Sequence, residues 1–190
     1  MPGLPSDFDV RVYFFDVEHG HAALIKTKGK SMLIDGGDIG KLEPAMRRLN
    51  VYQEADYGII THWDQDHYSG FQSGGMANTL YYSEYSALSY VYLKYEKQIA
   101  VTNDQDPIPI NLYQDNLCEV QCTIFAPPAS VSTSENKNSH SLGIRLVVKF
   151  RETEEREWGE TTFLILGDAT EEEVDGWMAK ELLLTVGFVQ

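Results

Sequence analysis

Alternating apolar and polar residues predict a group of strands in the first third of the chain. Residues 9–17 alternate and then become wholly apolar, as a strand that enters a core does. Two shorter strands are expected at residues 22–27 and 31–35, joined by a hairpin turn at Lys28-Gly29-Lys30. An apolar run at residues 57–61 is typical of a short, buried strand. The amino-terminal part of the chain is therefore predicted to form a sheet.

Three segments are predicted to be helical. A proline suited to the first helical turn predicts a helix over residues 44–49. A Tyr-rich segment, residues 84–99, is interpreted as a second helix. Thr170 and Glu173, three residues apart, have the pattern of a capping box. It predicts an amphipathic helix from there to about Leu184.

The second half of the chain predicts a second group of strands. We expect strands near Ile108 and over residues 120–125, the latter stopped by two consecutive prolines. Residues 142–150 and 161–166 are predicted to pair as strands, and they follow a Ser- and Asn-rich loop at residues 129–139. Strands are predicted in both halves of the sequence, with one helix between the two groups and one after them. This order predicts layers of sheet and helix, an α/β or α+β sandwich.

Length and composition indicate a single domain with a sizeable core. The chain has 190 residues, of which 43% are apolar and 23% are charged. We therefore expect one domain over residues 1–190. The formal net charge is −14, and so acidic a surface gains nothing from counterion release on nucleic acid. We expect no stable nucleic-acid binding, although brief contact by an enzyme is compatible with this charge.

The sequence shows no signal for a membrane or for export. No apolar run approaches the roughly 18 residues that a membrane span requires. The first residues lack the basic start and apolar stretch of a signal peptide. Cys118 and Cys122 lie in a predicted strand, where a spacing of four residues separates them by about 13 Å, beyond disulfide reach. We expect a cytoplasmic protein with free thiols and no membrane partner.

Four potential metal ligands occur within six residues, directly after the buried strand at residues 57–61. They are His62, Asp64, Asp66 and His67. Because alternate residues of an extended loop point the same way, several of these side chains can converge. Imidazole and carboxylate ligands together suit zinc, manganese or iron. The alternative is a polar turn with a salt-bridged Asp-His pair.

This stretch resembles the His-x-His-x-Asp-His motif of the metallo-β-lactamase superfamily, with Asp64 where the second histidine usually stands. Further segments resemble the ComEC-type competence-protein branch: an opening Asp-Val loop, a Leu-Ile-Asp-Gly-Gly turn, an Asn-x-x-Ser-Leu loop and a Gly-Asp after a buried strand. They lie at residues 15–22, 33–37, 138–142 and 166–168. The resemblance implies an αββα sandwich with a metal centre at one edge.

The resemblance also implies how two divalent metal ions would be held. His62 and Asp64 would bind one ion, Asp66 and His67 would bind the second, and Asp168 would bridge the two. Independently of the resemblance, an acid placed after the buried strand that precedes Asp168 needs a partner, because burying an unpaired charge is costly. Backbone amides before the last helix are the alternative partner. Zinc is the expected metal, with manganese or iron as alternatives.

Three residues of the Ser- and Asn-rich loop are further candidates for the same site. His140 lies where the superfamily has a metal-binding histidine, although a surface histidine is equally compatible with this loop. Asn138 and Ser141 are candidates for shaping a substrate pocket or stabilising developing charge. Among the ligands, Asp66 is the candidate catalytic residue that orients the attacking water.

The sequence departs from the family pattern in three places. His19 and His21 replace a Gln and an Asp of the opening loop, and we expect both to be solvated turn residues. Asp64 replaces a histidine, which lowers the preference for zinc. No histidine follows His140, whereas the family continues into a strand and a His-containing loop. We therefore expect a metallo-β-lactamase-like sandwich that is either complete through a substitute ligand or lacks its last strand and helix.

The expected function is a metal-dependent hydrolase that acts on a phosphodiester or nucleic-acid-type substrate, or another small hydrolysable compound, through a metal-activated water. The substrate class rests on the family resemblance. The alternative is a catalytically impaired or truncated remnant of the fold that acts as a binding module. A β-lactam-cleaving enzyme is a third alternative, which Asp64 and the lack of an export signal disfavour.

Overall fold

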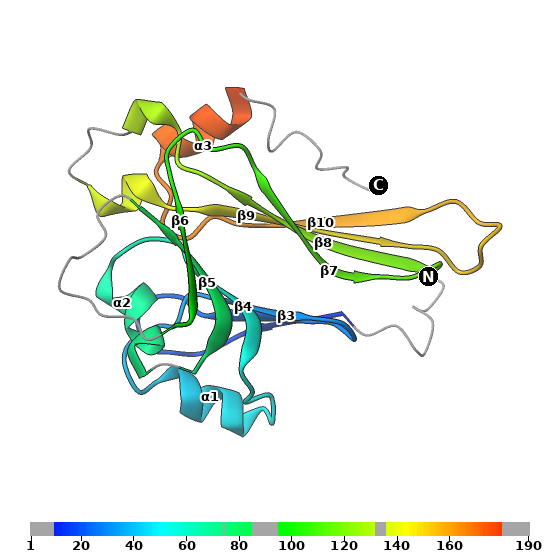
Figure 1. Ribbon diagram of the computed structural model, residues 1–190, viewed down its shortest axis with the longest axis horizontal. Helices are drawn as coiled ribbons and strands as arrows, with labels where there is room; N and C mark the ends of the chain where they lie inside the picture. The colour runs from blue at the N-terminus through cyan, green and yellow to red at the C-terminus, as the bar shows by residue number, and fades with distance from the viewer. Residues whose placement is uncertain (1–9, 74, 85–94, 132–135, 180–190) are drawn as a thin grey trace.

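Two β-sheets packed face to face make up most of the structure, a computed structural model that describes residues 10–73, 75–84, 95–131 and 136–179 (Figure 1). The first sheet has the strand order β1-β2-β3-β4-β5-β6. Its strands are β1 Arg11–Phe14, β2 Ala23–Lys26, β3 Ser31–Ile34, β4 Ala55–Ile60, β5 Ala77–Ser83 and β6 Lys97–Val101. β1, β2 and β3 are antiparallel, whereas β3 to β6 run parallel. The carboxyl ends of β3 and β4 therefore meet at one edge.

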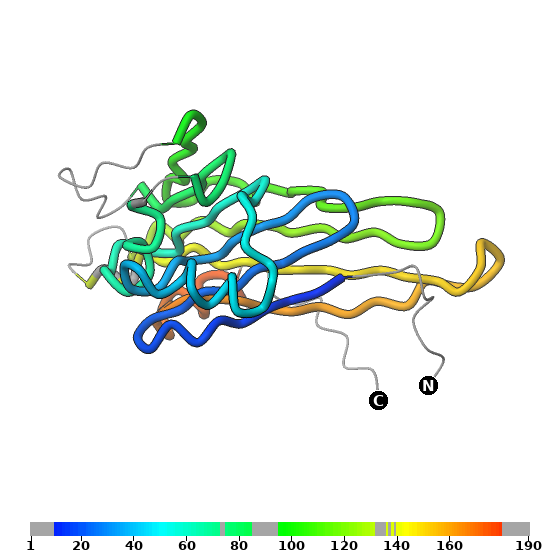
Figure 2. Tube along the Cα trace, turned by 90° about the horizontal axis from the view of Figure 1, so that it is seen from below, coloured from blue at the N-terminus to red at the C-terminus, as the bar shows by residue number. Residues whose placement is uncertain are grey.

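The second sheet is antiparallel and has the strand order β10-β9-β8-β7. Its strands are β7 Ile108–Gln114, β8 Cys118–Phe125, β9 Gly143–Phe150 and β10 Gly159–Ile165. Seen from below, β1 and β10 lie on the same side of the two sheets (Figure 2). The start of β9 lies beside the end of β4, because the Leu142 amide donates to the Thr61 carbonyl. Antiparallel pairing places the carboxyl end of β10 at the same edge.

Helices cover both outer faces of the two sheets (Figure 1). α1 Leu42–Arg48, the short α2 Gln65–Tyr68 and the 3-10 turn η1 Ser69–Ser73 lie on the first sheet. α3 Glu171–Ala179 and the 3-10 turns η2 Ala129–Val131 and η3 Lys137–His140 lie by the second. The order of layers is helix, sheet, sheet, helix, which is the predicted α+β sandwich of the metallo-β-lactamase type.

Alternate residues of the central strands face two different apolar layers. Leu24 and Leu33 point toward α1, where they pack with Met46, whereas Ile25 and Ile34 point toward the second sheet. This alternation follows from the two-residue period of a strand. These side chains are completely buried in both layers. The paired sheets thus form a rigid support for the loops at their edge.

Most of the predicted elements are present, but the helix predicted for the Tyr-rich segment is wrong at its carboxyl-terminal end. Residues 97–99 belong to strand β6, which pairs in parallel with β5, and residues 85–94 of that prediction lie outside the described part. The sequence patterns did not predict β5 either. The helices at residues 44–49 and after Thr170 correspond to α1 and α3, and the predicted end of the latter lies beyond the described residues.

The two cysteines are buried and free, as predicted. Both lie on β8 and belong to the apolar layer between the sheets. Burial raises the pKa of the Cys122 thiol to about 12, so neither its reactivity nor its charge contributes to a site. Within the described residues, no helix is long and apolar enough to cross a membrane.

Candidate metal centre

The loop after β3 places a buried carboxylate, Asp35, beside the end of β4. Parallel pairing aligns Ile34 with Ile59, and the Asp35 amide donates to the Ile59 carbonyl at 2.8 Å. The Thr61 amide donates to Asp35 Oδ1 at 2.8 Å, and the Thr61 hydroxyl donates to Oδ2 at 2.7 Å. His67 Nδ1 donates to the same Oδ2 at 2.9 Å. Asp35 therefore connects β3 to β4 and to α2.

These donors keep Asp35 ionised in spite of its burial. Burial alone would raise the pKa of a carboxyl group, but the His21 imidazole 3.7 Å away, the hydrogen bond from His67 and the Thr61 amide together lower the pKa of Asp35 to about 2. Asp35 is thus a fixed negative charge at every physiological pH. It attracts the donor hydrogens of the groups that surround it.

The carboxylate fixes the orientation of His67. Because Nδ1 of His67 donates to Asp35, the neutral form of the ring has its lone pair on Nε2. Nε2 lies 3.5 Å from Oδ1 of Asp168. Burial would lower the pKa of His67, but the hydrogen bond and charge of Asp35 and the charge of Asp168 raise it. A carboxylate behind an imidazole is the usual support for a metal-binding histidine.

The same carboxylate orients His62 through Thr61. The Thr61 hydroxyl gives its hydrogen to Asp35, so its oxygen accepts from His62 Nδ1 at 3.2 Å. This assigns the lone pair of His62 to Nε2, which is buried, has no hydrogen-bond partner within the part of the chain that the structure describes, and lies 3.6 Å from Asp64 Oδ2. Burial, followed by the charge of His67, lowers the pKa of His62. A neutral imidazole with an unused, buried nitrogen is suited to a cation.

His62, His67 and Asp168 form one cluster that could hold a metal ion. One ligand atom from each residue lies within 4.8 Å of the others, and the two imidazole rings are 4.1 Å apart between centroids. Asp168 follows β10 through Gly167, which packs against Thr61. The residues fit a divalent cation because the cluster combines two imidazole nitrogens with one carboxylate.

The other predicted ligands, Asp64, Asp66 and His140, are not brought into this cluster of three. Asp64, the residue before α2, is half-buried and faces His62, as described above. Asp66 is half-buried in α2, and its charge contributes to the raised pKa of His67. His140 is buried in η3 and lies outside the cluster of three. The Leu142 amide donates to the Thr61 carbonyl at 2.8 Å, which holds the end of this loop beside His62.

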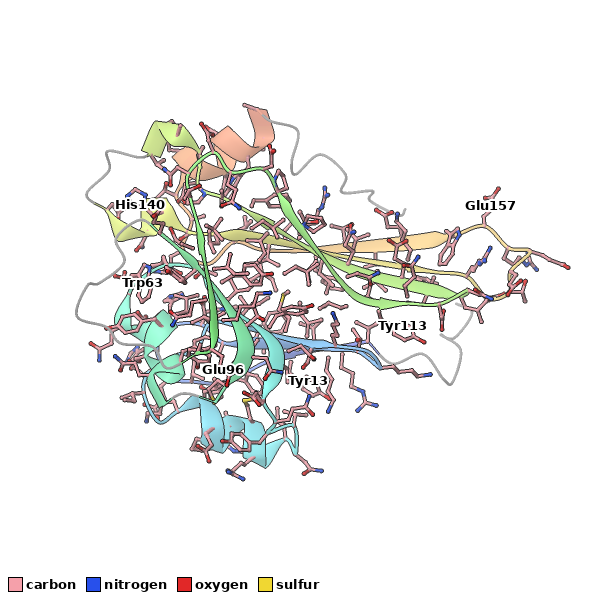
Figure 3. The ribbon with its side chains drawn as sticks, viewed as in Figure 1. Tyr13, Trp63, Glu96, Tyr113, His140 and Glu157 are labelled. Carbon is pink, nitrogen blue, oxygen red and sulfur yellow. The ribbon has the colours of Figure 1, made fainter. Side chains whose placement is uncertain are left out.

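Asn138 and Ser141, the predicted substrate-binding residues, lie in and after η3. The Ser141 hydroxyl donates to the Asn138 carbonyl at 2.8 Å. Ser141 is fully buried, whereas Asn138 is half-buried. The bond therefore shapes the loop around His140 (Figure 3).

Asp35 and Thr61 organise the cluster, although the sequence motifs predicted no role for either residue. Asp35 stands out in the sequence only as part of a turn motif. Its position directly after a buried strand is the signal that was expected to single out Asp168. For Asp168 that expectation is wrong, because β10 is largely exposed and the Asp168 side chain is 48% exposed. His21, expected to be solvated, is half-buried, and its Nδ1 lies 3.7 Å from Asp35 Oδ2. His19 is exposed, as expected.

The chain is similar in structure to several solved metallo-β-lactamases. The chain is similar to Rm3 metallo-β-lactamase (16% identity, TM-score 0.51), over 80% of this chain and 57% of that one. It is also similar to a B3 metallo-β-lactamase with an active-site glutamic acid (14%, 0.52), over 84% of this chain and 62% of that one. MIM-2 metallo-β-lactamase is a third example (17%, 0.50), with coverage of 90% and 66%.

These likenesses show the fold. The chain spans about three-fifths of the length of the metallo-β-lactamases that it matches. No protein-family model and no curated protein matches the sequence. The protein has the metallo-β-lactamase fold, and its cluster of His62, His67 and Asp168 lies where the loops of both sheets meet.

Proposed function

We propose that this protein is a metal-dependent hydrolase whose centre is formed by His62, His67 and Asp168, with Asp64 and Asp66 as additional ligands. The observation that carries this proposal is the buried Nε2 of His62, which has no hydrogen-bond partner among the described residues and lies near the carboxylates of Asp64 and Asp168. An unpaired buried nitrogen costs about 1–3 kcal/mol, and a bound cation would remove this cost.

A divalent cation held by these residues would supply Lewis acidity and lower the pKa of a water molecule. The chain supplies the positioning. Asp35 holds His67 directly and His62 through the Thr61 hydroxyl, and these bonds use Nδ1 of each ring and leave Nε2 available to a cation. Asp66 is proposed to orient the attacking water by accepting its hydrogen. His140 is proposed as a further ligand.

For the substrate we propose a phosphodiester or another small hydrolysable compound, on the basis of the ComEC-type motifs. Two metal ions are proposed, zinc first and manganese or iron as alternatives, since the ligand set mixes imidazole and carboxylate. For the compartment we propose the cytoplasm. No stable nucleic-acid or membrane partner is proposed.

The first experiment measures metal per chain by elemental analysis, on protein purified without chelator and then dialysed against zinc, manganese or iron(II). We expect metal affinity to be at least about tenfold lower in Asp168→Asn than in wild-type protein, because a carboxylate ligand is lost. Asp106→Asn is the matched control, since Asp106 is exposed and distant in sequence from every candidate ligand. No bound metal in folded wild-type protein would refute the centre.

The second experiment measures turnover on the loaded protein with bis(p-nitrophenyl) phosphate and with a chromogenic β-lactam. Hydrolysis of the diester that is lost in Asp66→Ala but kept in Asp106→Asn is the expected result. Hydrolysis of the β-lactam alone would overturn the substrate class while leaving the metal centre intact. Metal binding without any hydrolysis would favour the alternative, a binding module built on this fold.

A further inference from the structure

The loop between β1 and β2 packs against both segments that carry the candidate centre. The carbonyl of His21 accepts from the Gly37 amide at 3.0 Å, which ties the loop to the turn that follows Asp35. Gly20 has φ +78°, and a Cβ atom at this position would collide with the Asp66 carbonyl oxygen. The loop therefore approaches the main chain of α2 as closely as a glycine allows. A side chain on this loop is held at a fixed place relative to the turn and the helix.

The ring of His21 faces the buried carboxylate of Asp35. Its Nδ1 lies 3.7 Å from Asp35 Oδ2, and 30% of the whole side chain is exposed. Nδ1 itself is buried and has no hydrogen bond to any residue that the structure describes. At this distance the contact is electrostatic rather than a full hydrogen bond. Because a lone pair on Nδ1 would face a negative charge, the favoured form of the ring carries its hydrogen there.

Contacts of this kind matter because the backbone of Asp35 is strained. Asp35 has φ +55°, in a region that a residue with a side chain occupies only where its surroundings hold it. Thr61 donates to the carboxylate from the end of β4, and His67 donates from α2. His21 approaches the same carboxylate from the loop between β1 and β2. Asp35 is thus held from three segments of the chain.

We propose that His21 is a positioning residue of the candidate metal centre, which holds the Asp35 carboxylate in the orientation that supports His62 and His67. This inference rests on the proposed function, since it assigns His21 a part in the same site. His21 lies outside the three-residue cluster that could hold a metal ion. It therefore acts through Asp35 and does not bind the ion itself.

Long-range proton–nitrogen NMR spectra of metal-free protein test the proposal, at a mildly alkaline pH where imidazole groups are neutral. These spectra distinguish a hydrogen on Nδ1 from one on Nε2. In wild-type protein we expect the hydrogen of His67 on Nδ1 alone, because Asp35 accepts it. In His21→Leu we expect a mixture of both forms, because the carboxylate can turn away. His21→Asn, which has nearly the shape of leucine but carries a donor nitrogen on Cγ, should restore the wild-type spectrum.

Zinc affinity is the second measurement, made by competition with a chromophoric chelator. We expect His21→Leu to bind zinc at least about tenfold more weakly than wild type, which is the usual effect of losing a group that supports a ligand. His21→Asn should recover most of the affinity. His19→Leu is the matched control, since His19 is an exposed histidine of the same loop. It should match wild type in both measurements.

The outcomes separate this proposal from the proposed function. If His21→Leu keeps a single form of His67, or binds zinc as tightly as wild type does, the positioning role is overturned. Equal losses in His21→Leu and His21→Asn overturn it as well, because the shape of the ring and not its donor would then matter. If wild-type protein binds no zinc, the proposed function fails, and the NMR comparison alone decides the role of His21. Thermal unfolding verifies that each variant is folded.

Discussion

At the scale of single residues, one carboxylate organises the whole candidate centre. Asp35 accepts from the Thr61 amide, the Thr61 hydroxyl and His67 Nδ1. The hydroxyl in turn accepts from His62 Nδ1. Both histidines are thereby held in the form that presents Nε2, and neither needs to reorganise when a cation arrives. The affinity of the centre for metal therefore depends on residues that never touch the ion.

Thr61→Val tests this relay, because it removes the hydroxyl and keeps the shape of the side chain. We expect metal affinity to fall about 10- to 100-fold, the usual effect of losing a group that supports a ligand. Stability should fall by about 1–3 kcal/mol, since Asp35 and His62 each lose a buried partner. Competition with a chromophoric chelator measures the affinity, and urea unfolding measures the stability.

Thr61→Ser is the matched control for this prediction. It restores the hydroxyl and should recover most of the metal affinity. If Thr61→Val and Thr61→Ser bound metal equally well, the hydroxyl would have no part in orienting His62. The relay would then be a structural contact only.

At the scale of elements, the loop after β10 must approach β4 closely to bring Asp168 to the histidines. Gly167 has φ +55°, and a Cβ atom at this position would lie 2.8 Å from the Thr61 hydroxyl oxygen. Gly40 has φ +77°, but a Cβ atom there would have no other atom within 4 Å. The two glycines therefore share the left-handed conformation, and only Gly167 has the close contact.

Comparing Gly167→Ala with Gly40→Ala isolates the effect of that contact. Gly40→Ala should cost about 1 kcal/mol, because an L-residue is strained in the left-handed backbone conformation. Gly167→Ala should cost at least about 1 kcal/mol more, because the methyl group collides with Thr61, and it should also weaken metal binding. Equal costs and unchanged metal affinity in both variants would show that the loop can move without disturbing the centre.

α3 carries a buried acid that makes its packing sensitive to pH. The Thr170 amide donates to Glu173 Oε2 at 2.8 Å, as the capping box predicts. Glu173 is fully buried, and this burial raises its pKa from 4.5 to about 7 in spite of the Thr170 bonds. The folded protein thus binds a proton that the unfolded chain has released, so stability falls as pH rises through this window.

Glu173→Gln should remove this pH dependence. Between pH 4.5 and pH 7 the wild type is expected to lose up to about 3 kcal/mol of stability, at about 1.4 kcal/mol for each unit of pKa shift. Above that window the loss is complete, and Glu173→Gln should be the more stable protein. Urea unfolding at a series of pH values measures both. Glu171→Gln, an exposed residue of the same turn, should keep the wild-type profile.

Local patterns predicted strands that lie beside a tight turn and missed those that depend on distant pairing. β2 and β3 were predicted as two short strands joined by the turn at Lys28-Gly29-Lys30. β5 and β6 pair in parallel with β4 and with each other, so their partners come from segments far along the chain. Short apolar runs of this kind do not distinguish strand from helix by periodicity alone. The Tyr-rich segment was therefore assigned to the wrong element type at residues 97–99.

The candidate site shows the same division between local and distant information. His62, Asp64, Asp66 and His67 are close in sequence, so their spacing alone indicated a cluster. The role of Asp35 depends on the parallel register that aligns Ile34 with Ile59, which no local pattern of residues encodes. A carboxylate directly after a buried strand is a candidate site residue for this reason, since strand ends meet at one edge of a sheet.

At the scale of the whole molecule, the net charge of −14 sets the long-range field around the centre. Two divalent cations would leave the molecule strongly negative. An anionic substrate is repelled over distances comparable with the Debye length, which is about 30 Å at 0.01 M salt and about 10 Å at 0.1 M. Salt therefore screens a repulsion that opposes the approach of a phosphodiester, whereas an uncharged substrate experiences no such barrier.

We expect kcat/KM for bis(p-nitrophenyl) phosphate to rise about two- to tenfold between about 0.01 M and 0.1 M sodium chloride, because screening increases the rate of encounter. The value of kcat should stay constant, since the local arrangement of His62, His67 and Asp168 does not depend on salt. An uncharged ester measured in parallel should show no trend. A fall in kcat/KM with salt for the diester alone would mean that a local positive field at the centre, rather than the net charge, governs how substrate approaches.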